Sequence, residues 1–577
     1  MEYKFDLDDI ELTLFELLDL GPLQAISRFS GQTVEEYRAI VRQAAHFARR
    51  EVAALNERGD RTGAHLEDGR VRMPEGFRET WRRLGEMGLT AMDLSPEHGG
   101  LGLPSAVATA VAELVSGACP SLSAFHLLTH GVGRMVETFG SEALKRQHLP
   151  RLASGEETGT MCLTEPHAGS AVGDLRTAAT LQPDGSYLIQ GTKIFISGGG
   201  HDMAEDILHL VLARVVGDAP GTQGISLFAV PSRDNDVKVV SLERKMGIHA
   251  SPTCQMAFGE QGKCRGELLG QRSQGMRCMF QMMNAARLAV GQQGVATGGA
   301  AYEHALAYAR ERTQGGGTLI IEYPDVRRAL MTMKAYVEGL RILVQEAALF
   351  VDLQEHHPDA AVREGHEGML GVMTPVLKAF GSDMGFKVTE LAMQVFGGAG
   401  YTQDVPVEQY MRDLKAASLY EGTNGIQAMD LVGRKFLRNR GEHLNRYRAR
   451  LAASLEQAAK EAEAAPLAEK VHGALERFAD AARVLASRAG EDGKWAGLAA
   501  TPFLRALGEI MVGEALVRRA AFAARKLREG AEAKERARML QGKIEVARFH
   551  VAQLLPQADA ELARVTSEDR SALADVL

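Results

Sequence analysis

Residues 420–427 read Tyr-Glu-Gly-Thr-Asn-Gly-Ile-Gln, and Glu421 is the side chain here best suited to chemistry. The spacing predicts a helix start, where the helix dipole stabilises a carboxylate by roughly 0.3–1 kcal/mol. A carboxylate beside Gly422, which lets a ligand approach the backbone closely, would also suit a base aimed at a substrate. Position alone favours the solvated acid, and the choice depends on the other motifs of the chain.

Composition places the chain among soluble globular proteins. It has 577 residues, 45% hydrophobic and 24% charged, and its net charge is -8. At about 150 residues per domain this length predicts three or four units, and the acidity argues weakly against broad nucleic-acid binding. The sequence contains no run of 18 apolar residues, so no membrane span is predicted. The acidic N-terminus is unlike a signal peptide. Five scattered cysteines without zinc spacing predict no metal site and a reducing, cytoplasmic location.

The period of the apolar residues changes along the chain. Residues 36–56 form an amphipathic helical pattern. From about 156 to 275 short apolar runs predict strands, with 186–197 as a hairpin turning at Gln190-Gly191. Strands without intervening helices predict an antiparallel sheet or barrel.

Helical patterns return after residue 276. Apolar residues at steps of three and four predict long helices over 324–354 and 374–396, of the kind found in bundles. Residues 397–400, Gly-Gly-Ala-Gly, are typical of a helix C-terminus. Residues 456–470 form a charged connector within the helical segment 446–577. Neither a Rossmann glycine motif nor a P-loop follows a predicted strand.

Five stretches, taken together, resemble the acyl-CoA dehydrogenase family of flavoproteins. They are MCLTEPHAGS (161–170), KIFISGG (193–199), ARERTQG (309–315), QVFGGAGYTQDVPVEQYMRD (394–413) and YEGTNGIQ. The resemblance implies a mainly α fold with a central β-barrel. The predicted segments are a leader (1–35), a helical domain (36–155), the β-barrel (156–275), a helical bundle carrying the base (276–445) and a C-terminal helical domain (446–577). The extra length resembles a bacterial subfamily that includes 3-methylmercaptopropionyl-CoA dehydrogenase.

The resemblance favours the catalytic interpretation of Glu421 over the solvated acid, because Glu421 matches the family's catalytic base. That base removes the α-proton of an acyl-CoA thioester while the β-hydrogen leaves as hydride to FAD, which gives a trans-2-enoyl-CoA. Substrate binding should raise the pKa of Glu421 by desolvation, against the helix N–H groups. The implied flavin-binding residues are Met161, Leu163, Thr164, Ser170, Phe195, Ile196, Ser197, Arg312, Gln394, Gly397, Gly398, Thr423 and Asn424.

Some of these matches carry further implications. Arg312, Gln394, Gly397 and Gly398 correspond to family residues that reach a neighbouring subunit's flavin phosphates, which implies a homodimer or homotetramer. Thr423 is also a candidate N-cap. The substrate-side matches are Ser170, Asn284, Arg287 and Gly422, and Arg287 could instead serve a structural ion pair.

The chain departs from the family pattern after Arg312. Thr-Gln-Gly-Gly-Gly-Thr replaces the usual stretch there, and Tyr323-Pro324 stands where a His or Gln contacts the flavin. The glycines at 315–317 predict a flexible loop.

Electron-transferring flavoprotein is the implied electron acceptor, and the resemblance favours methylthiopropanoyl or short-to-medium straight acyl chains. The alternatives are an acyl-CoA oxidase that uses O₂, a DNA-associated relative without dehydrogenase activity, and a purely structural helical assembly.

Overall fold

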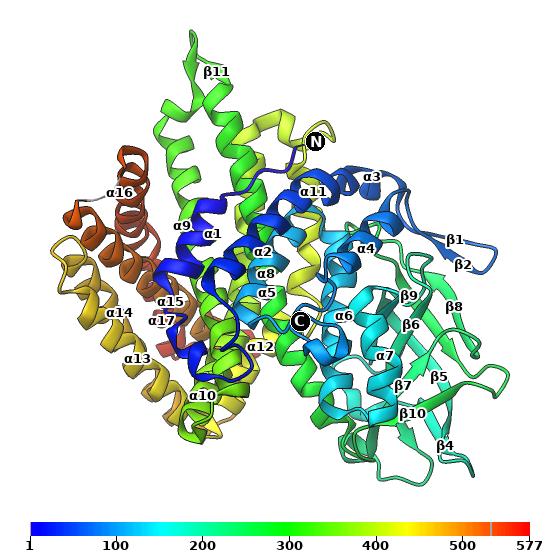
Figure 1. Cartoon of the computed structure of the whole chain (residues 1–577). Helices are drawn as coiled ribbons and strands as arrows, with labels where there is room; N and C mark the ends of the chain where they lie inside the picture. The colour runs from blue at the N-terminus through cyan, green and yellow to red at the C-terminus, as the bar shows by residue number, and fades with distance from the viewer. Residues whose placement is uncertain (1, 531–532, 577) are drawn as a thin grey trace. The chain divides into compact units, whose positions relative to one another are not determined.

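The structure is a computed structural model that describes residues 2–530 and 533–576. The chain divides into two compact units (Figure 1). Residues 39–286, with the first residues of the chain, form the first unit, and residues 4–38 and 287–577 form the second. Along the sequence, α2 (Val34–Phe47) and α8 (Gly275–Glu311) each belong partly to both units.

The first unit begins with helices and continues into a sheet. The predicted helix at 36–56 is confirmed, because α2 continues through a π-helical turn, Ala48–Val52, towards α3. Ser141 caps α7 by accepting a hydrogen bond from the backbone N–H of Leu144 (3.2 Å). The helices are α3 (Ala54–Thr62), α4 (Phe77–Glu86), α5 (Ser105–Ala118), α6 (Pro120–Phe139) and α7 (Glu142–Ser154).

The strands of this unit form a short hairpin and an eight-stranded sheet. The hairpin pairs β1 (His65–Glu67) with β2 (Arg70–Arg72). The larger sheet has the order β10-β7-β6-β4-β5-β9-β8, and β3 pairs with β6 outside that path. Its strands are β3 (Glu157–Cys162), β4 (Ala178–Leu181), β5 (Tyr187–Ser197), β6 (Asp206–Val215), β7 (Ile225–Pro231), β8 (Val237–Leu242), β9 (Thr253–Phe258) and β10 (Arg265–Leu269).

Two details of the sheet correct the sequence prediction. The sheet is mixed rather than antiparallel, because β6 runs parallel to β3 and to β4. The intervening chain is long enough for a parallel crossover. The predicted hairpin at 186–197 is also wrong, since Gln190 and Gly191 lie inside the continuous strand β5. A side chain at Gly191 would overlap Thr177, so this glycine serves close packing and not a turn.

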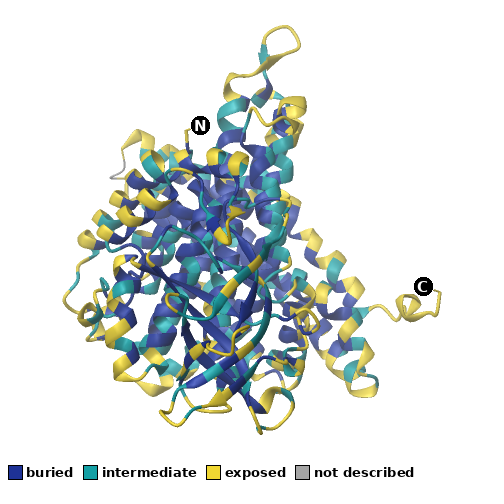
Figure 2. Ribbon diagram, turned by 90° about the vertical axis from the view of Figure 1, so that its right-hand side faces the viewer, coloured by how far each residue is buried: buried dark blue, intermediate teal, exposed yellow. Residues whose placement is uncertain are grey.

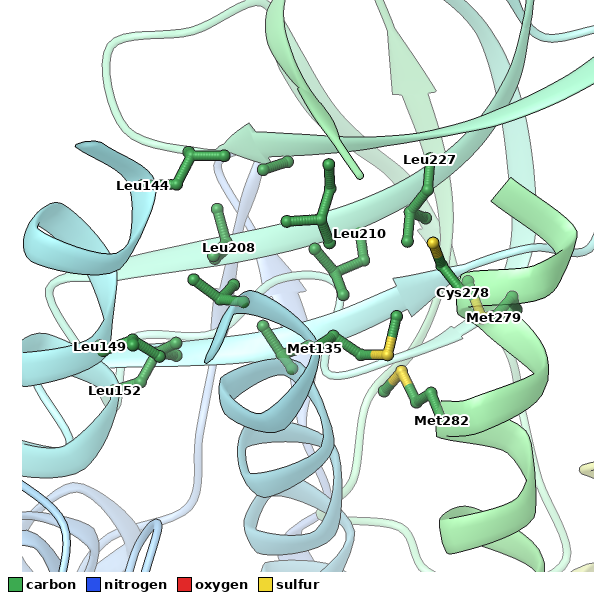
Figure 3. Packing of buried hydrophobic residues seen from close by; sticks show 14 of the residues in the cluster. Met135, Leu144, Leu149, Leu152, Leu208, Leu210, Leu227, Cys278, Met279 and Met282 are labelled. Atoms are coloured by element: carbon green, nitrogen blue, oxygen red, sulfur yellow. The ribbon is translucent and has the colours of Figure 1, made fainter. Parts of the chain in front are cut away.

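A hydrophobic core joins the helices of this unit to its sheet (Figure 3). Strand β6 is buried along almost its whole length, which explains its nearly continuous apolar run, typical of a strand covered on both faces. The labelled core side chains come from α6, α7, β6, β7 and the start of α8: Met135, Leu144, Leu149, Leu152, Leu208, Leu210, Leu227, Cys278, Met279 and Met282.

The second unit is helical, as predicted. The long helices α9 (Pro324–His356) and α10 (Ala360–Phe396) pack along each other and confirm the predictions for 324–354 and 374–396. Helix α10 ends at Gly397, so the interpretation of 397–400 as a helix end is confirmed. The glycines at 315–317 form the turn between the two-residue strands β11 (Thr313–Gln314) and β12 (Thr318–Leu319), which lies exposed at the tip of the hairpin (Figure 2).

The helical prediction for residues 446–577 is confirmed by a block centred on α15. Helix α15 packs against the other helices of the block, and also against α9, α10 and α12 (Asn424–Met429). The block comprises α13 (Glu442–Ala458), α14 (Ala465–Glu491), α15 (Lys494–Glu529), α16 (Lys534–Phe549) and α17 (Pro556–Thr566).

Buried charges tie the leader to this block. Asp9, in α1 (Leu7–Leu12), is paired with Arg519 of α15 (2.9 Å), Arg341 of α9 and Lys543 of α16. Burial would raise the pKa of Asp9, but the charges of Lys543, Arg519 and Arg341 hold it well below its usual value. Glu338 completes the cluster by accepting a hydrogen bond from Lys543 (2.8 Å). In the described residues, no helix has the length and apolar character to cross a bilayer.

Candidate active site

Glu421 lies in a strained turn directly before α12. Its φ is 55°, in the left-handed region that a residue other than glycine adopts at a cost of about 1–3 kcal/mol, and Gly422 follows with a φ of 84°. The side-chain amide of Gln427 donates to the carbonyl oxygens of Glu421 (3.2 Å) and Gly422 (3.3 Å). Thr423 accepts from the N–H of Ile426 (3.4 Å), which confirms its N-cap role. The first turn of α12 therefore holds the unusual backbone at residue 421.

The surroundings of Glu421 favour its protonated form. Its side chain is half-buried, and burial raises its pKa against the opposing charges of Arg287 and Lys378. This shift comes from burial by the protein itself, and two side chains oppose it, where the sequence led us to expect helix N–H groups; the further rise on substrate binding stays a prediction. Large apolar side chains at Leu419 and Ile426 are exposed on either side of Glu421 in the sequence.

Arg287 forms the structural ion pair that the sequence left open. Its guanidinium lies 3.3 Å from the carboxylate of Asp430, and both side chains are buried. Burial lowers the pKa of Arg287, while the charges of Asp430 and Glu421 oppose this. Arg287 thus places a positive charge near Glu421, and its predicted substrate contact stays a prediction.

The side chain of Asn424, the first residue of α12, forms hydrogen bonds with residues of α10. The Nζ of Lys378 donates to its Oδ1 (2.8 Å), and its Nδ2 donates to Asp383 (2.7 Å) and to Ser382 (3.0 Å). Burial lowers the pKa of Lys378 to about 8, although Glu421 and Asp383 favour its charged form. The Nδ2 of Asn424 also donates to the carbonyl of Ala379 (3.2 Å), so the predicted flavin contact of Asn424 would have to be made by a side chain that already has four partners.

Sequence analysis missed both Lys378 and Gln427. Gln427 was quoted within the motif at 420–427, but its role in holding the turn depends on side-chain direction. Lys378 is a single basic residue in the apolar run Pro375–Phe380, and a cation in such a run signals a buried partner.

In the first unit, the predicted flavin residues lie on β3, on the loop after it and at the end of β5. The carbonyl of Thr164 accepts from the N–H of Ile194 (2.9 Å). Glu165 next to it is buried and accepts from the Nζ of Lys193 (2.8 Å) and the hydroxyl of Thr177 (2.6 Å). These contacts hold the loop against β5.

The two partners of the Glu165–Lys193 pair respond differently to burial. Burial opposes ionisation of Glu165, but Lys193 and donors at residues 176–177 lower its pKa to about 2. For Lys193, burial outweighs the attraction of Glu165 and lowers its pKa. The pair therefore stabilises the carboxylate at the expense of desolvating the lysine.

Phe195 lies at a break in the regular pairing of β5 and its side chain is exposed there. The pairing of β5 with β9 shifts between Lys193 and Ile196, and Phe195 has a φ of 58° with 59% of its surface exposed. A bulge re-aims the side chain it carries, so Phe195 is presented to solvent although it is strongly apolar. Ile196 is buried in the core and is paired with Cys254 of β9, and Ser197 is half-buried, so their predicted flavin contacts stay predictions.

The other predicted residues occupy more open positions. In the first unit, Met161 and Leu163 are partly buried against the core, while Ser170 and Asn284 are exposed. In the second unit, the exposed residues are Arg312, Gln394, Gly397 and Gly398. Gly397 has a φ of 61°, and a side chain at Gly397 or Gly398 would meet open space. The structure thus brings Arg287, Glu421, Gly422, Thr423 and Asn424 together in the second unit.

Comparison with known proteins identifies the family. Four family models match consecutive parts of the chain: acyl-CoA dehydrogenase N-terminal domain (34–156), middle domain (160–260) and C-terminal domain (273–436), and acetyl-CoA dehydrogenase C-terminal like (449–574). The chain is 38% identical to 3-methylmercaptopropionyl-CoA dehydrogenase of Ruegeria pomeroyi, with 99% of both chains covered. It is 36% identical to the broad-specificity linear acyl-CoA dehydrogenase FadE5 of Mycobacterium tuberculosis, with 96% of both covered.

Solved structures agree with these relatives. An acyl-CoA dehydrogenase of Bacillus anthracis complexed with FAD superposes with a TM-score of 0.73 over 95% of this chain and 91% of that one, at 21% identity. A structure described as the electron transferring flavoprotein of Acidaminococcus fermentans superposes on 69% of this chain and 97% of its own, with a TM-score of 0.59 and 28% identity.

The chain belongs to the acyl-CoA dehydrogenase family. This confirms the family, the enzyme class, an oxidoreductase acting on acyl-CoA, and the cofactor, FAD, that the sequence predicted.

Proposed function

We propose that the enzyme converts an acyl-CoA to a trans-2-enoyl-CoA, with Glu421 as the base that removes the α-proton. The observation that carries this proposal is the turn at residue 421. A strained backbone, held by Gln427, presents a carboxyl group whose pKa is raised by burial. Strain of this kind is common where a side chain must be aimed.

The raised pKa suits the reaction. The α-proton of a thioester is a weak acid, and a base becomes more effective as its pKa approaches the working pH. A bound acyl chain would expel further water and strengthen this effect. The backbone N–H of Glu421 would donate to the thioester carbonyl as negative charge develops there. The left-handed Gly422 would leave room for the substrate beside this backbone.

The residues of the first unit fit FAD. Phe195 presents an exposed aromatic ring at a bulge, Ser197 follows it by two residues in β5, and the Thr164 carbonyl accepts from the N–H of Ile194 beside it; Thr164 and Ser197 would supply hydroxyls to the flavin. In the second unit, the open space at Gly397 and Gly398 would let backbone N–H groups face the flavin phosphates of a second copy. FAD supplies the acceptor for the β-hydride. The substrate-side roles of Ser170, Asn284 and Arg287 are part of the proposal.

Further parts of the proposal concern architecture and partners. The pairing of β10 with both β7 and β5 supports closure of the sheet into the predicted barrel. The family-model boundaries near residues 156–160, 260–273 and 436–449 support the five predicted segments. The exposed Arg312 and Gln394 would reach the flavin phosphates of a second copy in a homo-oligomer. The resemblance to the Acidaminococcus structure supports electron-transferring flavoprotein as the acceptor.

Flavin reduction tests the reaction directly. The FAD-loaded enzyme would be mixed without oxygen with methylthiopropanoyl-CoA and with straight-chain acyl-CoAs from butyryl to palmitoyl. We expect loss of flavin absorbance and an enoyl-CoA product with at least one of them. No bleaching by any would reject the proposal. Rapid reoxidation by O₂ with release of H₂O₂ would favour an oxidase over transfer to electron-transferring flavoprotein.

A further inference from the structure

The C-terminal block contacts the helix that follows the candidate base. Helix α15 packs against both α12 and α10. The ring of Phe503 in α15 stacks on Phe436, 12 residues after α12 begins, with centroids 5.6 Å apart. Gly508 of α15 lies against the ring of Phe380 in α10, so closely that a side chain there would overlap it. The C-terminal block therefore packs against α12 and the residues that follow it, up to Phe436.

A polar chain runs from this block to the start of α12. Arg505 of α15 lies 3.3 Å from one carboxylate oxygen of Asp383 in α10. The other oxygen of Asp383 accepts from Asn424 (2.7 Å), three residues after Glu421. Arg505 is itself approached by Glu561 of α17 (3.9 Å). Two helices of the C-terminal block are thus linked to the first turn of α12.

We propose that Arg505 and Asp383 are positioning residues that fix the turn at Glu421 through Asn424. The proposal rests on the proposed function in taking Glu421 as the base. Arg505 is 42% exposed and Asp383 26% exposed, so their ion pair adds little to global stability. Its effect is geometric: Arg505 orients the carboxylate that holds Asn424, and Asn424 sets where α12 begins.

The arrangement gives the C-terminal block a role in the reaction. Small displacements of a catalytic group slow a reaction steeply, by about 10²-fold for 1 Å. Asn424 keeps its bonds to Lys378 and Ser382 when Arg505 is lost, so the displacement should be a fraction of that. We therefore expect the effect of losing Arg505 to be about tenfold.

The test compares Arg505→Met with Arg477→Met in the full-length, FAD-loaded enzyme. Arg477 of α14 pairs with Asp559 of α17 (2.7 Å) at similar exposure, without a link to Asp383, and serves as the matched control. Arg505→Met should lower the limiting rate of flavin bleaching about tenfold, while the half-saturating acyl-CoA concentration stays within about twofold. Arg505→Lys should restore much of the rate, and Arg477→Met should match the parent.

Hydrogen exchange of the same proteins gives a readout independent of activity. Amides of residues 421–429 should exchange faster in Arg505→Met than in the parent and in Arg477→Met. Equal exchange in all three, or equal loss of rate in both Met variants, would overturn the inference. A parent that no acyl-CoA bleaches would reject the proposed function, and the exchange comparison would still decide the link between Arg505 and α12.

Discussion

Replacing Glu421 by Gln removes the candidate base with little change in shape. Glutamine keeps the length of the side chain and can occupy the same left-handed turn. The bonds from Gln427 that hold this turn go to backbone carbonyls and do not depend on the carboxylate. The change therefore isolates the charge and the proton-accepting oxygen of residue 421.

The expected loss of rate follows from the role of a general base. Such groups contribute about 10²–10⁴-fold, which corresponds to about 3–5 kcal/mol of activation free energy. We expect flavin bleaching by the best acyl-CoA to slow by at least the lower factor, with FAD content unchanged.

The stability of the Glu421→Gln fold should not fall with the rate. Because burial raises the folded-state pKa of Glu421 above its ordinary value of 4.5, the ionised carboxylate destabilises the fold at neutral pH. This penalty is absent well below pH 4.5 and grows as the pH rises through the folded pKa. Removing the carboxylate should leave the unfolding temperature at pH 7 unchanged or higher. Loss of the neighbouring charge should also lower the pKa of Lys378 further below about 8.

Stopped-flow absorbance and thermal unfolding measure these effects together. Glu456→Gln, at an exposed site in α13, provides the control. A Glu421→Gln enzyme that bleaches within about threefold of the parent rate would refute the assignment of the base. A lost rate accompanied by lost FAD or a markedly lower unfolding temperature would show that residue 421 supports the fold.

Three further changes test the surrounding structure. Arg312→Ala should speed FAD dissociation at least about tenfold on dialysis, since a charge-assisted bond is worth about 1.5–3 kcal/mol; unchanged retention would contradict its phosphate role. Lys193→Met should lower the free energy of unfolding by about 3–5 kcal/mol, because it leaves Glu165 buried without its cation; a loss below about 1 kcal/mol in urea titrations would contradict this. In the parent, the surroundings lower the pKa of Glu165 from its ordinary value of 4.5 to about 2. Its stabilisation is therefore full above pH 4.5 and is lost as the pH falls towards 2, which acid titration followed by circular dichroism measures. Arg519→Met should cost a similar 3–5 kcal/mol by weakening the cluster around Asp9, and an unchanged urea midpoint would argue against that.

The fold was predictable wherever one period ran for many residues. The stripe Leu330, Met333, Val337 and Leu340 specified α9, because such a repeat can only bury one face of a helix. The prediction at Gln190-Gly191 was wrong because glycine serves both in turns and at points of a strand where another segment packs closely, as Thr177 does here. The parallel pairing of β6 depends on contacts distant in sequence, which local patterns do not encode.

The candidate site was predictable only through motifs. Those motifs named Glu421, Phe195 and Thr423, but not the left-handed backbone at the first two, which depends on Gln427 and on the bulge in β5. The surroundings of Asn424 were missed because Lys378 and Asp383 lie more than 40 residues away in the chain. Hydrogen bonds between side chains so distant in the sequence leave no local pattern from which they could be predicted.

The ion cluster around Asp9 has a consequence for the order in which the protein is made. Asp9 leaves the ribosome early, whereas two of its partners, Arg519 and Lys543, are synthesised about five hundred residues later. Until then this carboxylate can meet only Arg341 among these three cations. The cluster around Asp9 is therefore complete only when translation is nearly finished, and removing the residues from α15 onward would leave Asp9 with Arg341 alone among these three cations.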